Sequence, residues 1–221
     1  MLFSSNKEIK IKQFDKTKHI IYFNYSGKIQ AKKKGLKKAI FLDRDGVIIE
    51  DVNYIKDPKS VFILKGVDNL LNHSKNLGYL NIIITNQSGI SRKFFNWEDY
   101  EKVTNKMIEL INYKKTINAI YANGEGPNNQ IDIDSWRKPN PNMLIQASKD
   151  FHIDLSSSIL IGDRLSDIQA GERAGIKNLF HVLTGHGVNE RKKIINYYDN
   201  YNKSYNLNLI DNLSSFQNKF L

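Results

Sequence analysis

The most constraining feature of this 221-residue chain is an alternation between short apolar segments and longer amphipathic ones, which runs from residue 38 to about residue 184. The apolar segments are rich in Ile, Leu and Val and have the length of strands, and most are followed by a stretch with helical spacing. Buried parallel strands joined by helices produce this pattern. We therefore predict an α/β fold with a central parallel sheet and helices on both faces.

The predicted elements follow each other in strict order. Strands are expected at residues 39–43, 79–85, 117–122, 157–163 and 178–184. Helices are expected at residues 66–78, 96–113, 140–151 and 167–175. Asn96 and Asp99 have the spacing of a capping box at the start of the second helix.

Residues 38–187 form the predicted domain, and the segments on either side differ from it in composition. Residues 1–38 contain eleven lysines and two acids, a formal charge of +9 out of +10 for the whole chain. Within this basic extension (residues 1–37), "EIKIKQF" and "HIIYFNY" predict a hairpin or strand pair. The tail, residues 188–221, is rich in Asn, Tyr and Lys, and we expect it to dock on the domain.

Composition excludes several classes of protein. The chain has no cysteine, so it forms no disulfide and has no thiolate metal site. Neither a signal peptide nor a membrane-spanning segment is recognisable, so we expect a cytoplasmic protein that does not insert into membranes. Outside the basic extension the chain is nearly neutral, so we do not expect nucleic acid to be its partner. We expect a monomer.

Polar and charged side chains follow the predicted strands at the point where each one ends. Asp43 and Asp45 follow the first strand, Thr85 ends the second, and Asp163 ends the fourth. Lys138 precedes a predicted helix between the third and fourth strands. Each motif alone could be a turn or a helix cap, but parallel strands bring their carboxyl ends to one edge of a sheet. Carboxylates gathered there repel each other unless a cation compensates, and ligands with oxygen donors alone favour Mg²⁺.

Four segments together resemble the haloacid-dehalogenase (HAD) superfamily of phosphohydrolases. They are "FLDRDGVI", "TNQSGI", "RKPNPNML" and "GDRLSDIQAGERAG". Within this superfamily they are similar to the branch that contains D,D-heptose 1,7-bisphosphate phosphatases and histidinol-phosphatases. The resemblance implies a Rossmann-like HAD fold. The short spacing between the motifs leaves no room for a large cap domain, so we expect an open site.

The resemblance implies a Mg²⁺-dependent phosphatase and assigns roles to individual residues. Asp43 would be the nucleophile that forms an aspartyl-phosphate, and Asp45 would transfer the protons. Thr85 and Lys138 would hold the phosphoryl oxygens. Mg²⁺ would be bound by Asp43, by the backbone carbonyl of Asp45 and by Asp163. The residues expected to contact the substrate are Asp51, Val52, Asn53, Tyr54, Asn86, Gln87, Ser88, Arg137 and Arg164, with Arg137 suited to a second phosphate.

One departure from the family concerns its zinc loop, which usually precedes "RKP" and carries Cys and His ligands. The corresponding positions here are near Ala122 and Gly124, and at Asp134 and Trp136. Because Ala, Gly and Trp have no suitable donor, we predict that no zinc is bound. We expect Trp136 to anchor the loop by packing.

The implied substrate is a small phosphorylated sugar. The first expectation is the C7 phosphate of D-glycero-D-manno-heptose 1,7-bisphosphate, an intermediate of lipopolysaccharide or capsule synthesis. Three alternatives stay open at this point: another sugar phosphate or histidinol phosphate, a polynucleotide 3′-phosphate, and an inactive scaffold. The altered loop makes the related sugar phosphatase the strongest of them.

Overall fold

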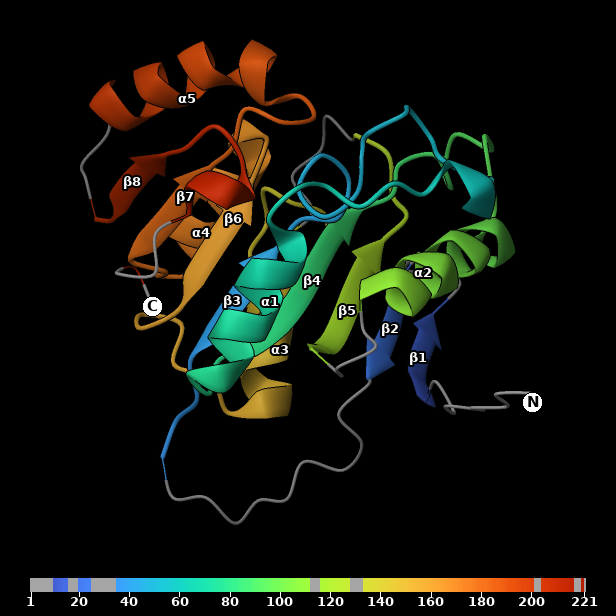
Figure 1. Ribbon diagram of the computed structural model, residues 1–221, viewed down its shortest axis with the longest axis horizontal. Coiled ribbons are helices and arrows are strands. Elements are labelled where there is room, and N and C mark those ends of the chain that lie inside the picture. Colours follow the sequence, from blue (N-terminus) through green and yellow to red (C-terminus); the bar gives the residue numbers. More distant parts are fainter. Residues whose placement is uncertain are drawn as a thin grey trace.

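The computed structural model describes residues 10–15, 20–24, 35–111, 116–127, 133–200, 204–216 and 220, and gives only the backbone for 10–15 and 20–24. The described strands form one sheet in the order β1-β2-β5-β4-β3-β6-β7-β8 (Figure 1). Their bounds are β1 (Lys10–Asp15), β2 (Ile20–Asn24), β3 (Ala39–Leu42), β4 (Leu80–Asn86), β5 (Ile117–Asn123), β6 (Ile159–Gly162), β7 (Asn178–His181) and β8 (Asn206–Leu209).

Six of these strands, from β5 across to β8, run parallel. The central strands β3 and β6 are buried along their whole length. This matches their continuous apolar sequences, because strands covered on both faces have no reason to alternate with polar residues. The predicted α/β fold with a parallel sheet is confirmed.

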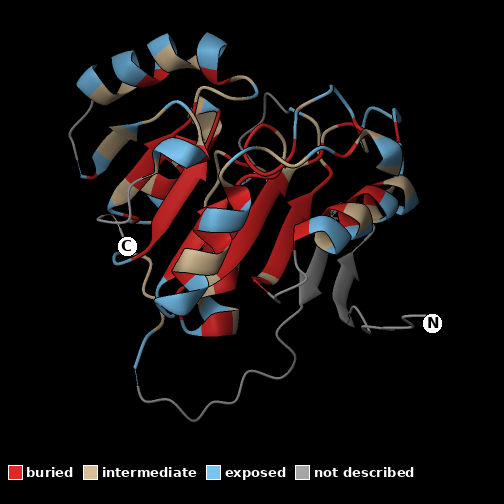
Figure 2. Ribbon diagram, in the orientation of Figure 1, coloured by how far each residue is buried: buried red, intermediate tan, exposed pale blue. Residues whose placement is uncertain are grey.

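Helices cover both faces of the sheet. α1 (Val67–Asn76) and α2 (Trp97–Ile111) bury their apolar sides with one set of strand side chains. α3 (Asn142–Phe151) and α4 (Leu165–Arg173) pack with the other set, together with Ile194 of α5 (Gly187–Asn200). Figure 2 shows the buried strands between these partly exposed helices. Asn96 and Asp99 form the expected capping box at α2, with reciprocal bonds of 3.0 and 3.2 Å.

The two ends of the chain add strands at opposite edges of the sheet. β1 and β2 pair antiparallel, and β2 pairs antiparallel with β5. The rest of residues 1–34 lies outside the described residues. In the tail, β8 joins β7 as a parallel edge strand. Its sequence "NLNL" was not predicted as a strand, because an edge strand that is half exposed lacks the apolar run of the central strands.

The carboxyl ends of the parallel strands all face the loops at the top of Figure 1. Within the described part of the chain, the segments that follow β3 and β4 contain only loops and one short turn of 3₁₀-helix, η1 (Pro58–Ser60). The edge of the sheet is therefore covered by loops alone, as expected for a fold without a large cap. No helix among the described residues is both long and apolar enough to span a membrane.

Candidate active site

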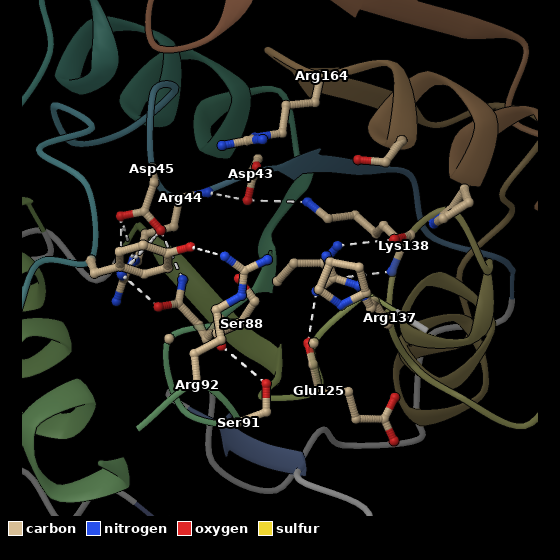
Figure 3. A pocket seen from close by; sticks show the side chains of 18 of the residues that line it. Asp43, Arg44, Asp45, Ser88, Ser91, Arg92, Glu125, Arg137, Lys138 and Arg164 are labelled. Atoms are coloured by element: carbon tan, nitrogen blue, oxygen red, sulfur yellow. Dashed lines mark hydrogen bonds and ion pairs between the residues drawn. The ribbon is translucent and has the colours of Figure 1, made fainter. Parts of the chain in front are cut away.

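A cavity of about 1330 Å³ opens at the carboxyl edge of the sheet. The loops that follow β3, β4, β5 and β6 line it, and the labelled side chains in Figure 3 project from these loops. Chain segments that are far apart in sequence therefore meet here, as parallel-sheet topology requires.

Three carboxylates form a tight cluster, and one of them, Asp43, lines this cavity. Asp43, Asp163 and Asp167 each place an oxygen within 4.8 Å of the others, and all three are buried. Burial raises the pKa of Asp43 to about 6, although Lys138 acts in the opposite direction. Burial, reinforced by Asp43 and Asp167, raises the pKa of Asp163 to about 8.

The cluster fits a divalent cation. Asp163 Oδ1 is buried and has no hydrogen-bond partner, although Asp163 Oδ2 accepts from the backbone N–H of His186 at 2.7 Å. A buried carboxylate oxygen without a donor is costly unless a cation satisfies it. The donors are all oxygens, as Mg²⁺ prefers. Among the described residues, this is the only group of three or more His, Asp or Glu side chains that could share an ion.

Lys138 supplies the positive charge that the protein itself brings to this cluster. Its Nζ lies 3.1 Å from Asp43 Oδ1 and 2.6 Å from Asp167 Oδ1, and it donates to the carbonyl of Ile84 at 3.0 Å. Burial alone would lower its pKa, but the two aspartates outweigh burial and raise it. The ammonium therefore stays charged inside the protein.

Asn86 fixes the backbone of Lys138. Its side-chain amide donates to the carbonyl of Lys138 and accepts from its N–H, both at 3.0 Å. Asn86 lines the cavity, but its amide is engaged by this clamp, so it acts first on the lysine and not on a ligand.

Asp45 faces a different set of partners from Asp43. Its carboxylate is 23% exposed and accepts from Arg44 and from Gln87 Nε2. Gln87 also donates to Thr85 Oγ1 at 2.8 Å, and both Gln87 and Thr85 are buried. Gln87 was predicted to contact substrate, but all the polar atoms of its side chain are bonded to protein groups. Thr85 Oγ1 accepts this bond, which leaves its own hydrogen available to donate.

The remaining predicted substrate contacts differ in position. Asp51, Asn53, Tyr54, Ser88, Arg137 and Arg164 line the cavity. Val52 does not, and its side chain is 43% exposed. The contact of Val52 with substrate therefore stays a prediction.

Arg92, Arg137 and Arg164 come from three loops and line the cavity (Figure 3). Burial, joined by repulsion from Arg164 and Arg92, lowers the pKa of Arg137. Arg137 Nη1 donates to the carbonyl of Glu125 at 2.7 Å, and Arg92 Nη1 donates to the hydroxyl of Tyr54 at 2.8 Å. Cations gathered in a cavity in this way form a natural binding site for an anion.

Sequence reasoning assigned no role to three residues of the site. Asp167 is the third residue of α4, where its Oδ2 accepts from the backbone N–H of Arg164 at 3.0 Å and its carboxylate joins the cluster. The signal was its spacing of four from Asp163. His186 places Nε2 2.9 Å from Asp51 Oδ2 and lines the cavity, and Arg92 lines it as well. No pattern in the sequence around His186 indicates this contact.

The loop that replaces the zinc-binding segment of the family is held by hydrogen bonds and packing. Ala122 is buried in β5, Asp134 is exposed, and Trp136 packs on Tyr121 with ring centroids 5.7 Å apart. Asn142 donates to the carbonyls of Ile133 and Ser135 at 2.6 and 3.0 Å. The four positions do not offer a set of zinc ligands. Residues 128–132 of this loop lie outside the described residues.

Ser135 joins this loop to Arg137. Its hydroxyl donates to Glu125 Oε2 and accepts from the backbone N–H of Arg137 at 3.0 Å. Because Glu125 also accepts the Arg137 guanidinium through its carbonyl, the arginine is held at both its backbone and its side chain.

Known proteins with similar sequences are phosphatases. A family model for HAD-like hydrolases matches residues 135–205. D-glycero-beta-D-manno-heptose-1,7-bisphosphate 7-phosphatase of Helicobacter pylori is 39% identical over 144 residues, which cover 64% of this chain and 81% of the relative. The alpha-specific counterpart of Burkholderia mallei is also 39% identical, over 63% of this chain and 76% of the relative.

Solved structures give the same result. D,D-heptose 1,7-bisphosphate phosphatase from B. bronchiseptica, crystallised with magnesium and phosphate, matches with a TM-score of 0.68 and 25% identity, over 80% of this chain and 94% of that one. A HAD-like phosphatase from Mesorhizobium loti matches with a TM-score of 0.67 and 31% identity, over 75% and 80%.

Proposed function

The chain belongs to the HAD-like hydrolases, in the family of the heptose-1,7-bisphosphate 7-phosphatases, and from this premise we propose that it removes the C7 phosphate of D-glycero-D-manno-heptose 1,7-bisphosphate. The observation that carries the proposal is the contact of the Lys138 ammonium with both Asp43 and Asp167 beside the buried Asp163. A nucleophile, a cation and a metal-binding cluster in one place are the parts that phosphoryl transfer requires.

In the first step, Asp43 attacks the phosphorus atom. A bond forms between its carboxylate oxygen and phosphorus, and the bond from phosphorus to the C7 oxygen breaks. The C7 oxygen keeps the electron pair of that bond and takes a proton from Asp45. The products are the C7 alcohol and a phosphorylated Asp43.

In the second step, water hydrolyses this intermediate. Asp45, now a carboxylate, takes a proton from the water, whose oxygen bonds to phosphorus as the bond to Asp43 breaks. Inorganic phosphate leaves, and both aspartates return to their starting states. Lys138 stabilises negative charge on the phosphoryl oxygens in both steps, and Thr85 donates its hydroxyl hydrogen to one of them.

The metal would be held by Asp43, Asp163 and the backbone carbonyl of Asp45. When bound, Mg²⁺ would reduce the repulsion between a carboxylate nucleophile and an anionic phosphoryl group. The partnerless oxygen of Asp163 and the raised pKa values of Asp43 and Asp163 support this assignment. Asp167 neutralises Lys138 and orients it.

The C1 phosphate would bind to Arg137 and Arg164, which line the cavity. Guanidinium groups bind phosphate through two parallel N–H donors. Arg92 reinforces this positive side of the cavity. Asp51, Asn53, Tyr54 and Ser88 line the same cavity and would contact the sugar.

A phosphate-release assay with Mg²⁺ tests the proposal. The panel contains both anomers of the heptose bisphosphate, heptose 7-phosphate, histidinol phosphate, other sugar phosphates and a 3′-phosphorylated oligonucleotide. We expect the heptose bisphosphates to give the highest kcat/KM. The relatives include phosphatases named for the beta anomer and others named for the alpha anomer, so the preferred anomer is a result of the assay. Preference for histidinol phosphate or for the oligonucleotide would overturn the substrate assignment, and no release from any member would overturn the activity.

A further inference from the structure

Arg44 lies between the two aspartates of the first motif, and its side chain is buried within the protein. It is 1% exposed. Its Nε and Nη2 donate to the carboxylate of Asp45 at 3.3 and 3.0 Å, and Nη2 also donates to Gln87 Oε1 at 3.0 Å. Its guanidinium carbon lies 4.9 Å from the centroid of the Tyr100 ring. A solvated lysine or arginine on a turn would show none of this.

The Asp45 carboxylate offsets the cost of burying this cation. Burial alone would lower the pKa of Arg44, but the Asp45 carboxylate outweighs that effect, and the pKa is raised. The face of the Tyr100 ring adds an attraction for the guanidinium, and both side chains are buried. Arg44 is therefore a permanent charge that cannot leave Asp45 without a large cost, because among the described residues Asp45 is the acidic side chain that forms an ion pair with it.

Gln87 completes the surroundings of Asp45. Its Nε2 donates to Asp45 Oδ2 at 2.7 Å, and its Oε1 accepts from Arg44. Three N–H groups from Arg44 and Gln87 thus occupy the lone pairs of Asp45 that face the protein, and the exposed 23% of this side chain borders the cavity. A carboxylate has about four acceptor positions, so one position is left for proton exchange.

We propose that Arg44 is a positioning residue for proton transfer: with Gln87 and the Tyr100 ring behind it, it fixes the Asp45 carboxylate so that only its cavity edge exchanges protons with the leaving oxygen and with water. This inference rests on the proposed function, in which Asp45 is the proton carrier. A purely structural role for Arg44 would give the same contacts, so the test must measure proton transfer to the leaving group.

The leaving group provides that report. An alkoxide such as the C7 oxygen of the sugar must be protonated as it leaves, whereas 4-nitrophenolate leaves without a proton. For each variant we compare kcat/KM for heptose 1,7-bisphosphate with kcat/KM for 4-nitrophenyl phosphate at saturating Mg²⁺. The ratio of the two values is independent of the fraction of enzyme that is folded, since an unfolded fraction lowers both equally.

Three variants are compared. Arg44→Lys keeps the positive charge but loses the planar guanidinium, and Arg44→Met keeps only the apolar part of the side chain. Gln87→Met removes the second side chain that donates a hydrogen bond to Asp45. Asp45→Asn is the reference for complete loss of proton transfer. We expect Arg44→Lys to lower the ratio by about 10-fold or more, because positioned acid–base catalysis contributes about 10²–10⁴-fold. Arg44→Met should approach the reference, and Gln87→Met should lower the ratio less than Arg44→Lys does.

Failure of the inference and failure of the proposed function give different results. If Asp45→Asn lowers the ratio but the Arg44 and Gln87 variants keep the ratio of the unmodified protein, the positioning role is wrong. Loss of activity on both substrates to the same degree in folded Arg44→Lys also overturns it. If Asp45→Asn itself leaves the ratio unchanged, Asp45 is not the proton carrier. If the unmodified protein hydrolyses neither substrate, the proposed function is wrong.

Discussion

The two sides of the cavity are built on opposite principles. On the sheet side, Asp43, Lys138, Asp163 and Asp167 are buried and bonded to each other or to backbone, and each follows or neighbours a central strand. On the loop side, the arginines come from loops, and Arg164 is exposed and Arg137 half-buried. The difference indicates that the sheet positions the reacting groups, for which a small displacement would lower the rate of the reaction. Loops carry the groups that select, where side chains can be exchanged without disturbing the core.

The largest expected effect lies on the sheet side. Lys138→Met leaves Asp43 and Asp167 buried without their shared cation. Breaking a buried ion pair costs about 3–5 kcal/mol, so we expect the free energy of unfolding of the Mg²⁺-free protein to fall by that amount. Loss of an electrostatic donor at the phosphoryl group should lower kcat by about 10²–10³-fold. Urea unfolding and initial rates measure the two effects. A stable variant with normal kcat would show that the sheet side has no special role.

The second expectation concerns pH and the metal. In the Mg²⁺-free protein the pKa of Asp163 is raised to about 8 by burial, from an ordinary value of 3.8. Between these two pH values the folded state holds a proton that the unfolded chain releases. Stability from this group is therefore present at low pH and is lost as pH rises toward and through about 8.

Thermal unfolding across this pH range tests the expectation. We expect the Tm of the Mg²⁺-free protein to decrease from about pH 5 to about pH 8.5, and the decrease to be smaller in Asp163→Asn. Added Mg²⁺ should raise Tm most at the high end, since metal binding requires deprotonated ligands. Parallel pH profiles for the two proteins would contradict the assignment of Asp163.

A smaller effect, of a different kind, is expected on the loop side. Arg137→Met should raise KM for the heptose bisphosphate by about 10- to 100-fold, because one charge-assisted contact contributes about 1.5–3 kcal/mol. Its kcat should change little, as expected when binding is lost equally in ground and transition states. Heptose 7-phosphate, which lacks the C1 phosphate, is the matched control substrate, and its KM should not change. A decrease in kcat with an unchanged KM would show that Arg137 acts in the chemical step, and would contradict the division between a reacting side and a binding side.

The smallest effect is expected in the loop that holds Arg137. Asn142→Ala removes two hydrogen bonds to backbone carbonyls, each with a net contribution of about 1 kcal/mol. We expect a modest decrease in Tm and a rise in KM for the bisphosphate of no more than about 10-fold, which is about 1.4 kcal/mol.

A zinc-selective chelator tests whether zinc contributes to holding the same loop. With Mg²⁺ restored, treatment should leave KM unchanged, since the loop offers no zinc ligand set in its described residues. A KM that rises after chelation and recovers with zinc would contradict this.

How far the sequence could predict this molecule follows the same division. The parallel sheet and the meeting of Asp43, Asp163 and Lys138 were predictable, because strand ends converge whatever the loops do. The direction of a side chain within a loop was not. Val52 does not line the cavity although its loop neighbours Asp51 and Asn53 do, and the amide of Gln87 donates to Asp45.

Other elements were missed because their signals are weak or ambiguous. β8 has a polar edge sequence, so its pairing with β7 depends on the neighbouring strand and not on its own composition. Arg44 was visible in "DRDG", but the pattern does not distinguish a solvated arginine from one stacked on Tyr100, a residue 56 positions away.

The most direct test of the central claim is to identify the residue that becomes phosphorylated. Enzyme that is turning over heptose bisphosphate with Mg²⁺ is quenched in acid and digested, and the peptides are analysed by mass spectrometry. The account predicts one phosphoryl group on the peptide that contains Asp43, absent from Asp43→Asn. A phosphoryl group on another residue, or none in an enzyme that is actively releasing phosphate and whose Asp43→Asn variant remains active, would contradict it.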